Sequence, residues 1–365
     1  MIRGSTGFGF AKDASMCFAR WFGFAVVMVG IHTAAVLADT RLNGTGASLP
    51  APLYQAWIAD YKAAHPDVEI DYQAKGSGAG ISAITDKTVD FAGSDAPLTD
   101  AELARAGGHI VEIPATAGGV AIAYNLPGFS GDLKLTGPVV ADIFLGNITK
   151  WNDAKIAAVN PGAALPDLAI APIVRGDKSG TTFVFTSYLA TQSDDAKEVI
   201  GVDKTGNWPV GQRGEKSDGV TQLLLQVKGG VGYIELNYAS KNHLPVALLQ
   251  NKAGKFVAPT PDAVSAAATA AAVKLSGDQM TTSIWNQDGE KSYPISTFSY
   301  LIVYKDLAYV KDGAKAKAIV DFLGWVESDG QSKSAALDYA PLSDEVTTKV
   351  KRLIGSLTYS GGPVK

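Results

Sequence analysis

Helix-like and strand-like patterns alternate along most of the chain. The apolar side chains of residues 50–64 recur at helical spacing, whereas residues 68–72 (VEIDY) alternate apolar and polar positions, as half-buried strands do. Further strands are expected at 90–93, 120–124, 169–174, 232–236 and 300–304, and further helices at 81–87, 182–190, 219–226, 263–275 and 314–328. The spacing of Thr99 and Glu102 is typical of a capping box and predicts another helix start there. Strands that alternate with helices in this way predict an α/β fold with largely parallel sheets.

The N-terminal segment has the pattern of a secretory signal peptide. Residues 1–20 carry three basic side chains against one acidic one, and residues 21–38 are apolar and end in small residues. This pattern predicts cleavage of residues 1–38 before Asp39. An uncleaved membrane anchor is the alternative, because the apolar run approaches the ~20 residues that span a bilayer, although polar residues dilute it.

Composition excludes several classes of protein. The chain has 365 residues, of which 46% are hydrophobic and 19% charged, so it can bury sizeable cores and is neither disordered nor fibrous. Its net charge of −4, without a basic block, argues against nucleic acid as a partner. The single cysteine, Cys17, excludes a disulfide framework and a cysteine metal site, and the four histidines argue against a histidine-rich one. Cleavage would leave a cysteine-free exported chain, which suits an oxidising compartment such as a bacterial periplasm.

Four clusters of glycine and small polar residues carry the chemical signal. They are GTGAS (44–48), GSGAGIS (76–82), GSDAP (93–97) and RGDKSGTT (175–182). Three of them lie where a strand or loop leads into a predicted helix, so that exposed backbone N–H groups and the helix dipole would favour an anion. Arg175 would add a planar guanidinium suited to an oxyanion. The alternative is that the clusters are ordinary turns and helix caps.

Motifs of nucleotide binding and catalysis do not match. Asp177 stands where a phosphate-binding Walker loop needs a glycine, and residues 76–81 lack the third glycine of a dinucleotide fingerprint. The sequence contains neither a GxSxG nor an HExxH motif, and no histidine has a convincing catalytic neighbour. We therefore expect a protein that is not an enzyme, with no catalytic residue, cofactor or metal site.

Five segments in order resemble the periplasmic phosphate-binding proteins of bacterial ABC phosphate importers. They are GTGASLPAPLYQAW (44–57), YQAKGSGAGISAI (72–84), TVDFAGSDAPLT (88–99), IFLGNITKWND (143–153) and VRGDKSGTTFVFTSYL (174–189). The resemblance covers essentially the whole chain after residue 38. It implies two α/β lobes joined by two crossovers, with the ligand in the cleft between them. Lobe I would comprise residues 39–124 and 297–365, and lobe II residues 125–296.

The resemblance also implies a set of phosphate ligands. Carried over motif by motif, they fall on Ser48, Leu49, Ser77, Asp95, Arg175, Ser179, Gly180 and Thr181, with Asp177 placed to hold the guanidinium. Ser48-Leu49 replaces the Thr-Phe pair common in the family and keeps the hydroxyl. Gly78 stands where relatives often have serine, and Lys178 where they often have glycine; we expect the Lys178 ammonium to face water.

Asp95 is the unusual member of this set, because a carboxylate repels an anion. An ionised aspartate only accepts hydrogen bonds, so it needs a ligand that carries a proton. Phosphate keeps a proton near neutral pH and sulfate does not, so Asp95 would select phosphate through an unpaired buried charge in the sulfate complex. The alternative role for Asp95 is a turn or helix-capping residue before Pro97.

The expected function is therefore binding of inorganic phosphate in the periplasm and its delivery to an ABC transporter permease in the inner membrane, by a monomer without a cofactor. Three alternatives remain open: a phosphate-ester hydrolase on the same scaffold, a carrier of another tetrahedral oxyanion, and a surface adhesin or scavenger that uses the same pocket. The first would need an activated nucleophile or metal. The second would not need the carboxylate of Asp95.

Overall fold

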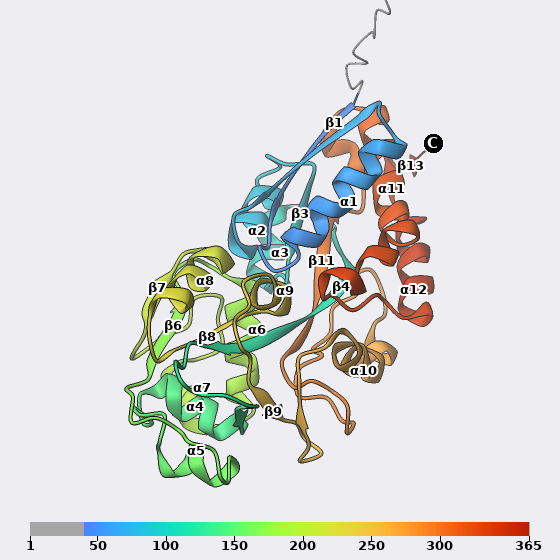
Figure 1. Ribbon diagram of the computed structural model, residues 1–365. Helices are drawn as coiled ribbons and strands as arrows, with labels where there is room; N and C mark the ends of the chain where they lie inside the picture. Colours follow the sequence, from blue (N-terminus) through green and yellow to red (C-terminus); the bar gives the residue numbers. More distant parts are fainter. Residues whose placement is uncertain (1–39, 365) are drawn as a thin grey trace, which may run out of the picture. The chain divides into compact units, whose positions relative to one another are not determined.

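The computed structural model describes residues 40–364 (Figure 1). The predicted signal peptide and Cys17 lie outside these residues. One large mixed sheet contains the strands β1 (Thr40–Gly46), β2 (Val68–Ala74), β3 (Phe91–Ser94), β4 (Ile110–Tyr124), β6 (Ala171–Arg175), β7 (Gln212–Gly214), β8 (Gly230–Glu235) and β11 (Ser296–Tyr304). A small sheet contains β5 (Lys134–Leu135), β9 (Leu248–Gln250) and β10 (Phe256–Val257), and β12 (Thr358–Tyr359) pairs with β13 (Gly362–Pro363).

Helices connect most of these strands. The α-helices are α1 (Ala51–Ala64), α2 (Ser77–Thr85), α3 (Asp100–Ala106), α4 (Gly137–Leu145), α5 (Ala154–Val159), α6 (Gly180–Ala190), α7 (Asp194–Val199), α8 (Lys216–Gln226), α9 (Leu236–Lys241), α10 (Pro261–Ala271), α11 (Gly313–Val326) and α12 (Asp344–Ile354). Four short 3₁₀ helices are η1 (Ala272–Lys274), η2 (Leu307–Val310), η3 (Asp329–Lys333) and η4 (Ala335–Leu337). None of the helices within residues 40–364 combines the length and the apolar character needed to cross a membrane.

The strand order of the large sheet is β2-β1-β3-β11-β4-β8-β6-β7. β2, β1 and β3 run parallel to one another, as do β8, β6 and β7, and the antiparallel pair β11 and β4 joins the two groups. The α/β prediction is confirmed, but the sheet is mixed rather than largely parallel, because four of its seven strand pairings are parallel and three are antiparallel. Each parallel group has its own helical connections, as crossovers between parallel strands require.

β4 belongs to both halves of this sheet. Its residues 110–119 pair with β11, and its residues 120–124 pair with β8. The change of partner therefore occurs between Gly119 and Val120, a few residues before the predicted lobe boundary at Tyr124. The lobe boundaries themselves stay a prediction.

Two local predictions are confirmed. Leu53, Trp57 and Tyr61 of α1 are buried on one face of the helix, as their spacing predicts. Thr99 caps α3 through the backbone N–H of Glu102, and the Glu102 carboxylate accepts from the backbone N–H of Thr99, which completes the predicted capping box.

Other boundaries differ from the prediction because polar residues interrupt an apolar pattern. β11 begins at Ser296 rather than at residue 300, since Ser296, Thr297 and Ser299 are buried in the sheet although their side chains are polar. α8 begins at Lys216 rather than at Gly219. Both additional segments lie next to the site described below.

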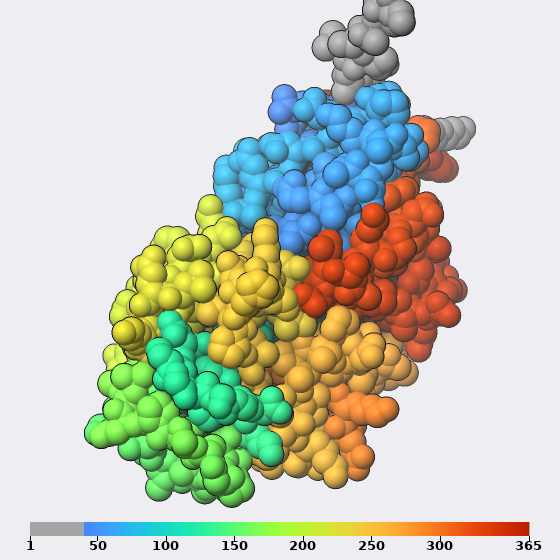
Figure 2. Space-filling view, in the orientation of Figure 1, coloured from blue at the N-terminus to red at the C-terminus, as the bar shows by residue number. Residues whose placement is uncertain are grey.

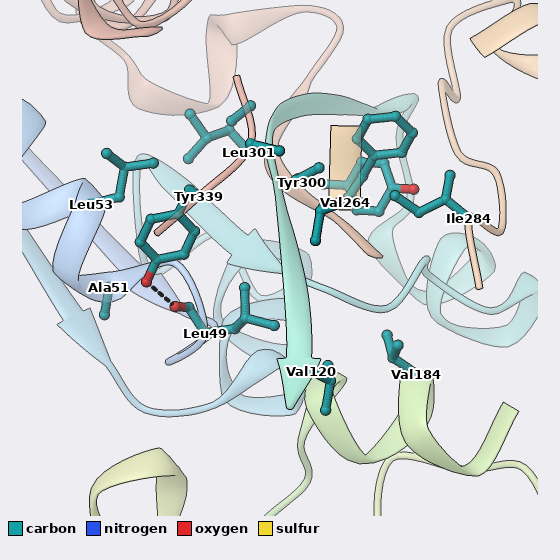
Figure 3. Packing of buried hydrophobic residues seen from close by; sticks show 14 of the residues in the cluster. Leu49, Ala51, Leu53, Val120, Val184, Val264, Ile284, Tyr300, Leu301 and Tyr339 are labelled. Carbon is teal, nitrogen blue, oxygen red and sulfur yellow. Dashed lines mark hydrogen bonds between the residues drawn. The ribbon is translucent and has the colours of Figure 1, made fainter. Parts of the chain in front are cut away.

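Segments that are distant in sequence pack side by side in the part of the large sheet that contains β1, β2 and β3. α11 packs against α1 and β1, and Figure 2 shows the C-terminal segment, in red, directly beside the N-terminal one, in blue. In the buried cluster of Figure 3, the Tyr339 hydroxyl donates to the backbone oxygen of Leu49 at 2.7 Å. The C-terminal segment thereby fixes the loop that follows β1.

Candidate functional site

The predicted site residues follow the carboxyl ends of the parallel strands. Ser48 follows β1, the first turn of α2 follows β2, and Asp95 follows β3. In the other group, Arg175 ends β6 and Gly180 begins the helix that follows. Crevices at the carboxyl ends of strands are where open α/β sheets bind ligands, and hydrogen bonds and close contacts join the two groups of residues here.

Arg175 is the centre of the site. Its side chain is 2% exposed, and each of its N–H groups has an acceptor. Nε and Nη2 donate to the two oxygens of Asp177 at 2.8 and 2.7 Å. The three remaining bonds are longer: from Nη2 to Ser48 at 3.3 Å, and from Nη1 to Thr181 and Ser217 at 3.4 Å each. Because a guanidinium has five donors, these three long bonds to hydroxyl groups are the ones that a bound anion could replace.

Asp177 holds this guanidinium in place, as predicted. Its Oδ1 also accepts the backbone N–H of Lys216 at 3.0 Å. Burial by itself would raise the pKa of Asp177, but the bonds from Arg175 and Lys216 hold it below the usual value. Burial likewise opposes the charge of Arg175, and the pair with Asp177 nevertheless raises its pKa. Both groups are therefore charged, with the guanidinium fixed in one orientation.

Asp95 is buried opposite these donors and is 2% exposed. Ser299 donates to its Oδ1 at 2.8 Å, Ser77 donates to its Oδ2 at 3.4 Å, and the backbone N–H of Asp95 donates to Ser77 at 3.2 Å. Burial raises the pKa of Asp95 to about 7, although Ser299, Arg175 and Ser77 lower it in part. Thr99, not Asp95, caps the following helix. Asp95 is therefore a carboxyl group that changes its protonation near neutral pH.

The N-terminus of α6 completes the cluster. Ser179 caps this helix by accepting the backbone N–H of Thr182 at 3.2 Å, and the first-turn N–H groups of a helix have no acceptor within it. A Cβ on Gly180 would lie 2.8 Å from the Cβ of Asp95 and would also overlap the hydroxyl of Ser77. Only glycine therefore lets this helix end approach the Asp95 side of the site so closely.

The glycine loop before α2 contacts the loop that carries Asp177. The backbone N–H of Gly78 donates to the oxygen of Lys178 at 3.0 Å. A Cβ on Gly78 would lie 2.5 Å from the Cβ of Lys178, and one on Gly76 would lie 2.6 Å from Oδ2 of Asp177. A side chain at residue 78 would therefore fill space that Lys178 occupies. Lys178 itself is exposed.

The structure brings the predicted residues into one neighbourhood, to which Leu49 belongs through its place next to Ser48. The side chain of Leu49 is buried in the core, and its carbonyl oxygen is held by Tyr339. Whether each residue contacts a ligand stays a prediction. Within residues 40–364, no three His, Cys, Asp or Glu side chains form a group that could hold a metal ion.

Three further residues lie beside the site but are not predicted from the sequence. Ser299 bonds Asp95, Ser217 lies 3.0 Å from the hydroxyl of Ser48, and the buried Glu235 ends β8. Ser299 and Ser217 lie outside the four glycine clusters, and Ser217 falls before the predicted start of its helix. The position of β7 and β8 beside β6 is the signal that locates Ser217 and Glu235, because parallel neighbours end at the same edge.

The arrangement is a buried set of hydrogen-bond donors with one fixed positive charge and one carboxyl group. Arg175, the hydroxyl groups and the helix end suit a small oxyanion. Asp95 adds an acceptor when it is ionised, and it therefore favours an oxyanion that keeps a proton. We find no nucleophile paired with a general base among the described residues that surround Arg175.

Comparison with known proteins identifies the family of this chain. The model of the PBP superfamily domain matches residues 33–329. The chain is 40% identical over 314 residues to phosphate-binding protein PstS of Xylella fastidiosa, an alignment that covers 86% of this chain and 84% of the relative. It is also 40% identical over 311 residues to the PstS protein of Pasteurella multocida, covering 85% of this chain and 88% of the relative.

Solved structures show the same fold. A high-affinity periplasmic phosphate-binding protein, PfluDING, solved with phosphate, superposes with a TM-score of 0.69 at 23% identity, covering 86% of this chain and 93% of that one. A phosphate-binding protein from Stenotrophomonas maltophilia gives a TM-score of 0.68 at 21% identity, covering 86% and 94% of the two chains. The relatives are named as binding proteins rather than as enzymes. This chain belongs to the PBP superfamily and, within it, to the PstS family of phosphate-binding proteins.

Proposed function

We propose that this protein binds inorganic phosphate at the Arg175–Asp95 site in the periplasm and delivers it to an ABC transporter permease. The observation that supports this most strongly is the combination of the buried arginine and the buried carboxyl group. Three N–H groups of Arg175 face hydroxyl groups over long bonds. Asp95 supplies the acceptor that a protonated phosphate oxygen needs.

The donors of the site supply the affinity. Each charge-assisted hydrogen bond contributes ~1.5–3 kcal/mol, so several of them exceed the cost of association. Ser48, Ser77, Ser179, Thr181 and the backbone of Leu49 and Gly180 would surround the anion together with Arg175, whose orientation Asp177 sets. Micromolar or tighter binding follows from such a set.

Opening and closing of two lobes would admit and release the anion. Residues 39–124 with 297–365 would form one lobe and residues 125–296 the other, so that Asp95 and Arg175 would come from opposite lobes. Phosphate would favour the closed form by bonding to both. The closed form, as a monomer, would dock on the permease.

Calorimetric titration of the chain without residues 1–38 tests this proposal. We expect saturable one-to-one binding of phosphate at pH 8 and much weaker binding of sulfate, which has no proton to donate to the ionised Asp95. Equal binding of both anions would contradict the role of Asp95, and binding of neither would contradict the proposal as a whole. Turnover of a chromogenic phosphate ester by the same preparation would instead support the hydrolase.

Delivery needs a separate test in cells. Uptake of radiolabelled phosphate by cells that lack this gene should be restored by the full chain. It should not be restored by an Arg175→Ala variant, which lacks the central cation. Equal restoration by both chains would contradict the transport role of the site.

A further inference from the structure

Ser217 occupies a position that the predicted ligand set leaves out. It lies in the first turn of α8, directly after β7, and is 1% exposed. Its Oγ lies 3.0 Å from Oγ of Ser48 and accepts a bond from Nη1 of Arg175 at 3.4 Å. Ser48 accepts a second bond from Nη2 of the same guanidinium at 3.3 Å. The two serines and the guanidinium thus form a closed triangle of hydrogen bonds.

The protons in this triangle are limited in number. Arg175 can only donate, so both hydroxyl oxygens act as acceptors toward it. Each serine has one proton of its own, and one of the two lies between the oxygens. The other is free for a further acceptor. The direction of the Ser217–Ser48 bond therefore decides which serine can donate to an anion.

The predicted ligand set fixes this direction. Ser48 belongs to that set and has a single hydroxyl proton. If this proton goes to the anion, it is not available to Ser217, so the 3.0 Å bond between the two serines must use the proton of Ser217.

We propose that Ser217 is a positioning residue of the anion site, which donates its proton to Ser48 and so leaves the proton of Ser48 for the bound anion. The inference rests on the proposed phosphate function and deepens it. The charge of Arg175 polarises both hydroxyl groups, and Ser217 sets the direction in which they donate. Ser217 acts through Ser48 and needs no contact with phosphate.

A double-mutant cycle tests this coupling. We would measure the phosphate Kd of the wild-type chain, Ser48→Ala, Ser217→Ala and the double variant by calorimetry at pH 8. Loss of one neutral hydrogen bond predicts that Ser217→Ala weakens phosphate binding ~5–10-fold. In the Ser48→Ala background the same substitution should weaken binding by less than about twofold, because the relay no longer has a target.

Two controls separate positioning from general damage. Ser187 is a buried serine of α6 whose hydroxyl group has no partner within the described residues, so Ser187→Ala should leave the phosphate Kd unchanged. Ser217→Thr keeps the hydroxyl group and should bind within about threefold of the wild-type chain, whereas Ser217→Val, of similar shape, should not. This second pair tests the inference if Ser217→Ala fails to fold.

Several results would overturn the inference. Wild-type affinity in Ser217→Ala would do so, and so would independent, multiplicative losses in the double variant, which would mean that the two serines act separately. Equal affinities of the threonine and valine variants would show that the hydroxyl group is unimportant. A wild-type chain that binds no phosphate would refute the proposed function itself and the inference with it.

Discussion

The protonation state of Asp95 predicts how the choice between phosphate and sulfate changes with pH. Sulfate has no proton near neutral pH, so it can accept a hydrogen bond from protonated Asp95 but cannot donate one to the ionised form. The buried carboxyl group has a pKa of about 7. We therefore expect sulfate to bind only the protonated form, and its apparent affinity to follow the protonated fraction.

The size of the effect follows from this pKa. Above it, the protonated fraction falls ~tenfold per pH unit, so sulfate affinity should decrease ~100-fold between pH 5 and pH 9 and level off below about pH 6. In Asp95→Asn the side-chain amide is a permanent donor. Sulfate affinity in this variant should therefore be almost independent of pH, and the preference for phosphate should be lost.

Calorimetric titration of sulfate at five pH values and constant ionic strength is the assay. Sulfate suits it better than phosphate, because phosphate itself titrates within this range. A sulfate affinity that does not change between pH 5 and pH 9 in the wild-type chain would refute the reasoning. The same pH dependence in Asp95→Asn would also refute it, because the change would then arise from another group.

Three further predictions concern the glycine loop before α2, the buried Glu327 and the ion pair between Lys204 and Glu102. Gly78→Ser should weaken phosphate binding, and adding Lys178→Gly should restore it, because a Cβ at residue 78 would lie 2.5 Å from that of Lys178; wild-type Kd in the single variant would contradict this. Glu327 is buried without a hydrogen-bond partner among residues 40–364, and burial raises its pKa well above the ordinary value. The contribution of Glu327 to stability should therefore be greatest below its unfolded pKa of ~4.3 and fall by up to ~1.4 kcal/mol per pH unit as the pH rises toward the folded pKa. Denaturant melts should show that Glu327→Gln loses less stability than the wild-type chain over this range; identical pH profiles of the two chains would show that Glu327 does not titrate as expected. Lys204, in predicted lobe II, donates to both oxygens of Glu102, in predicted lobe I, at 2.9 Å. Because such an ion pair would hold the two lobes together, Lys204→Met should speed phosphate release a few-fold in stopped-flow measurements. An unaltered release rate would exclude a role for the pair in closure.

The sequence was most informative where burial follows a period. α1 shows its apolar face directly, and the capping box of Thr99 and Glu102 marks the start of α3. Alternating elements predict parallel strands, because each crossover needs a helix. The strand order β2-β1-β3-β11-β4-β8-β6-β7 could not be predicted, because it depends on pairing between strands that are distant in sequence.

Polar residues inside the core explain what the sequence could not show. Ser299 lies in the central strand β11, where its polar side chain interrupts the apolar pattern that predicts a strand. It is nevertheless buried, because its hydroxyl group donates to Asp95. Ser217 stands in an unremarkable polar stretch, and only the place of β7 beside β6 brings it to Arg175. The glycine clusters were visible because close approach of backbones restricts the residue type, as at Gly180.

The central claim is that phosphate lies between Arg175 and Asp95. A crystal structure of the chain with phosphate at pH 8 tests it most directly. We predict one anion within hydrogen-bond distance of the guanidinium of Arg175, the hydroxyl of Ser77 and the N-terminus of α6, with one phosphate oxygen donating to Asp95. An anion bound elsewhere, or one that leaves the Asp95 carboxyl group without a contact, would contradict the account.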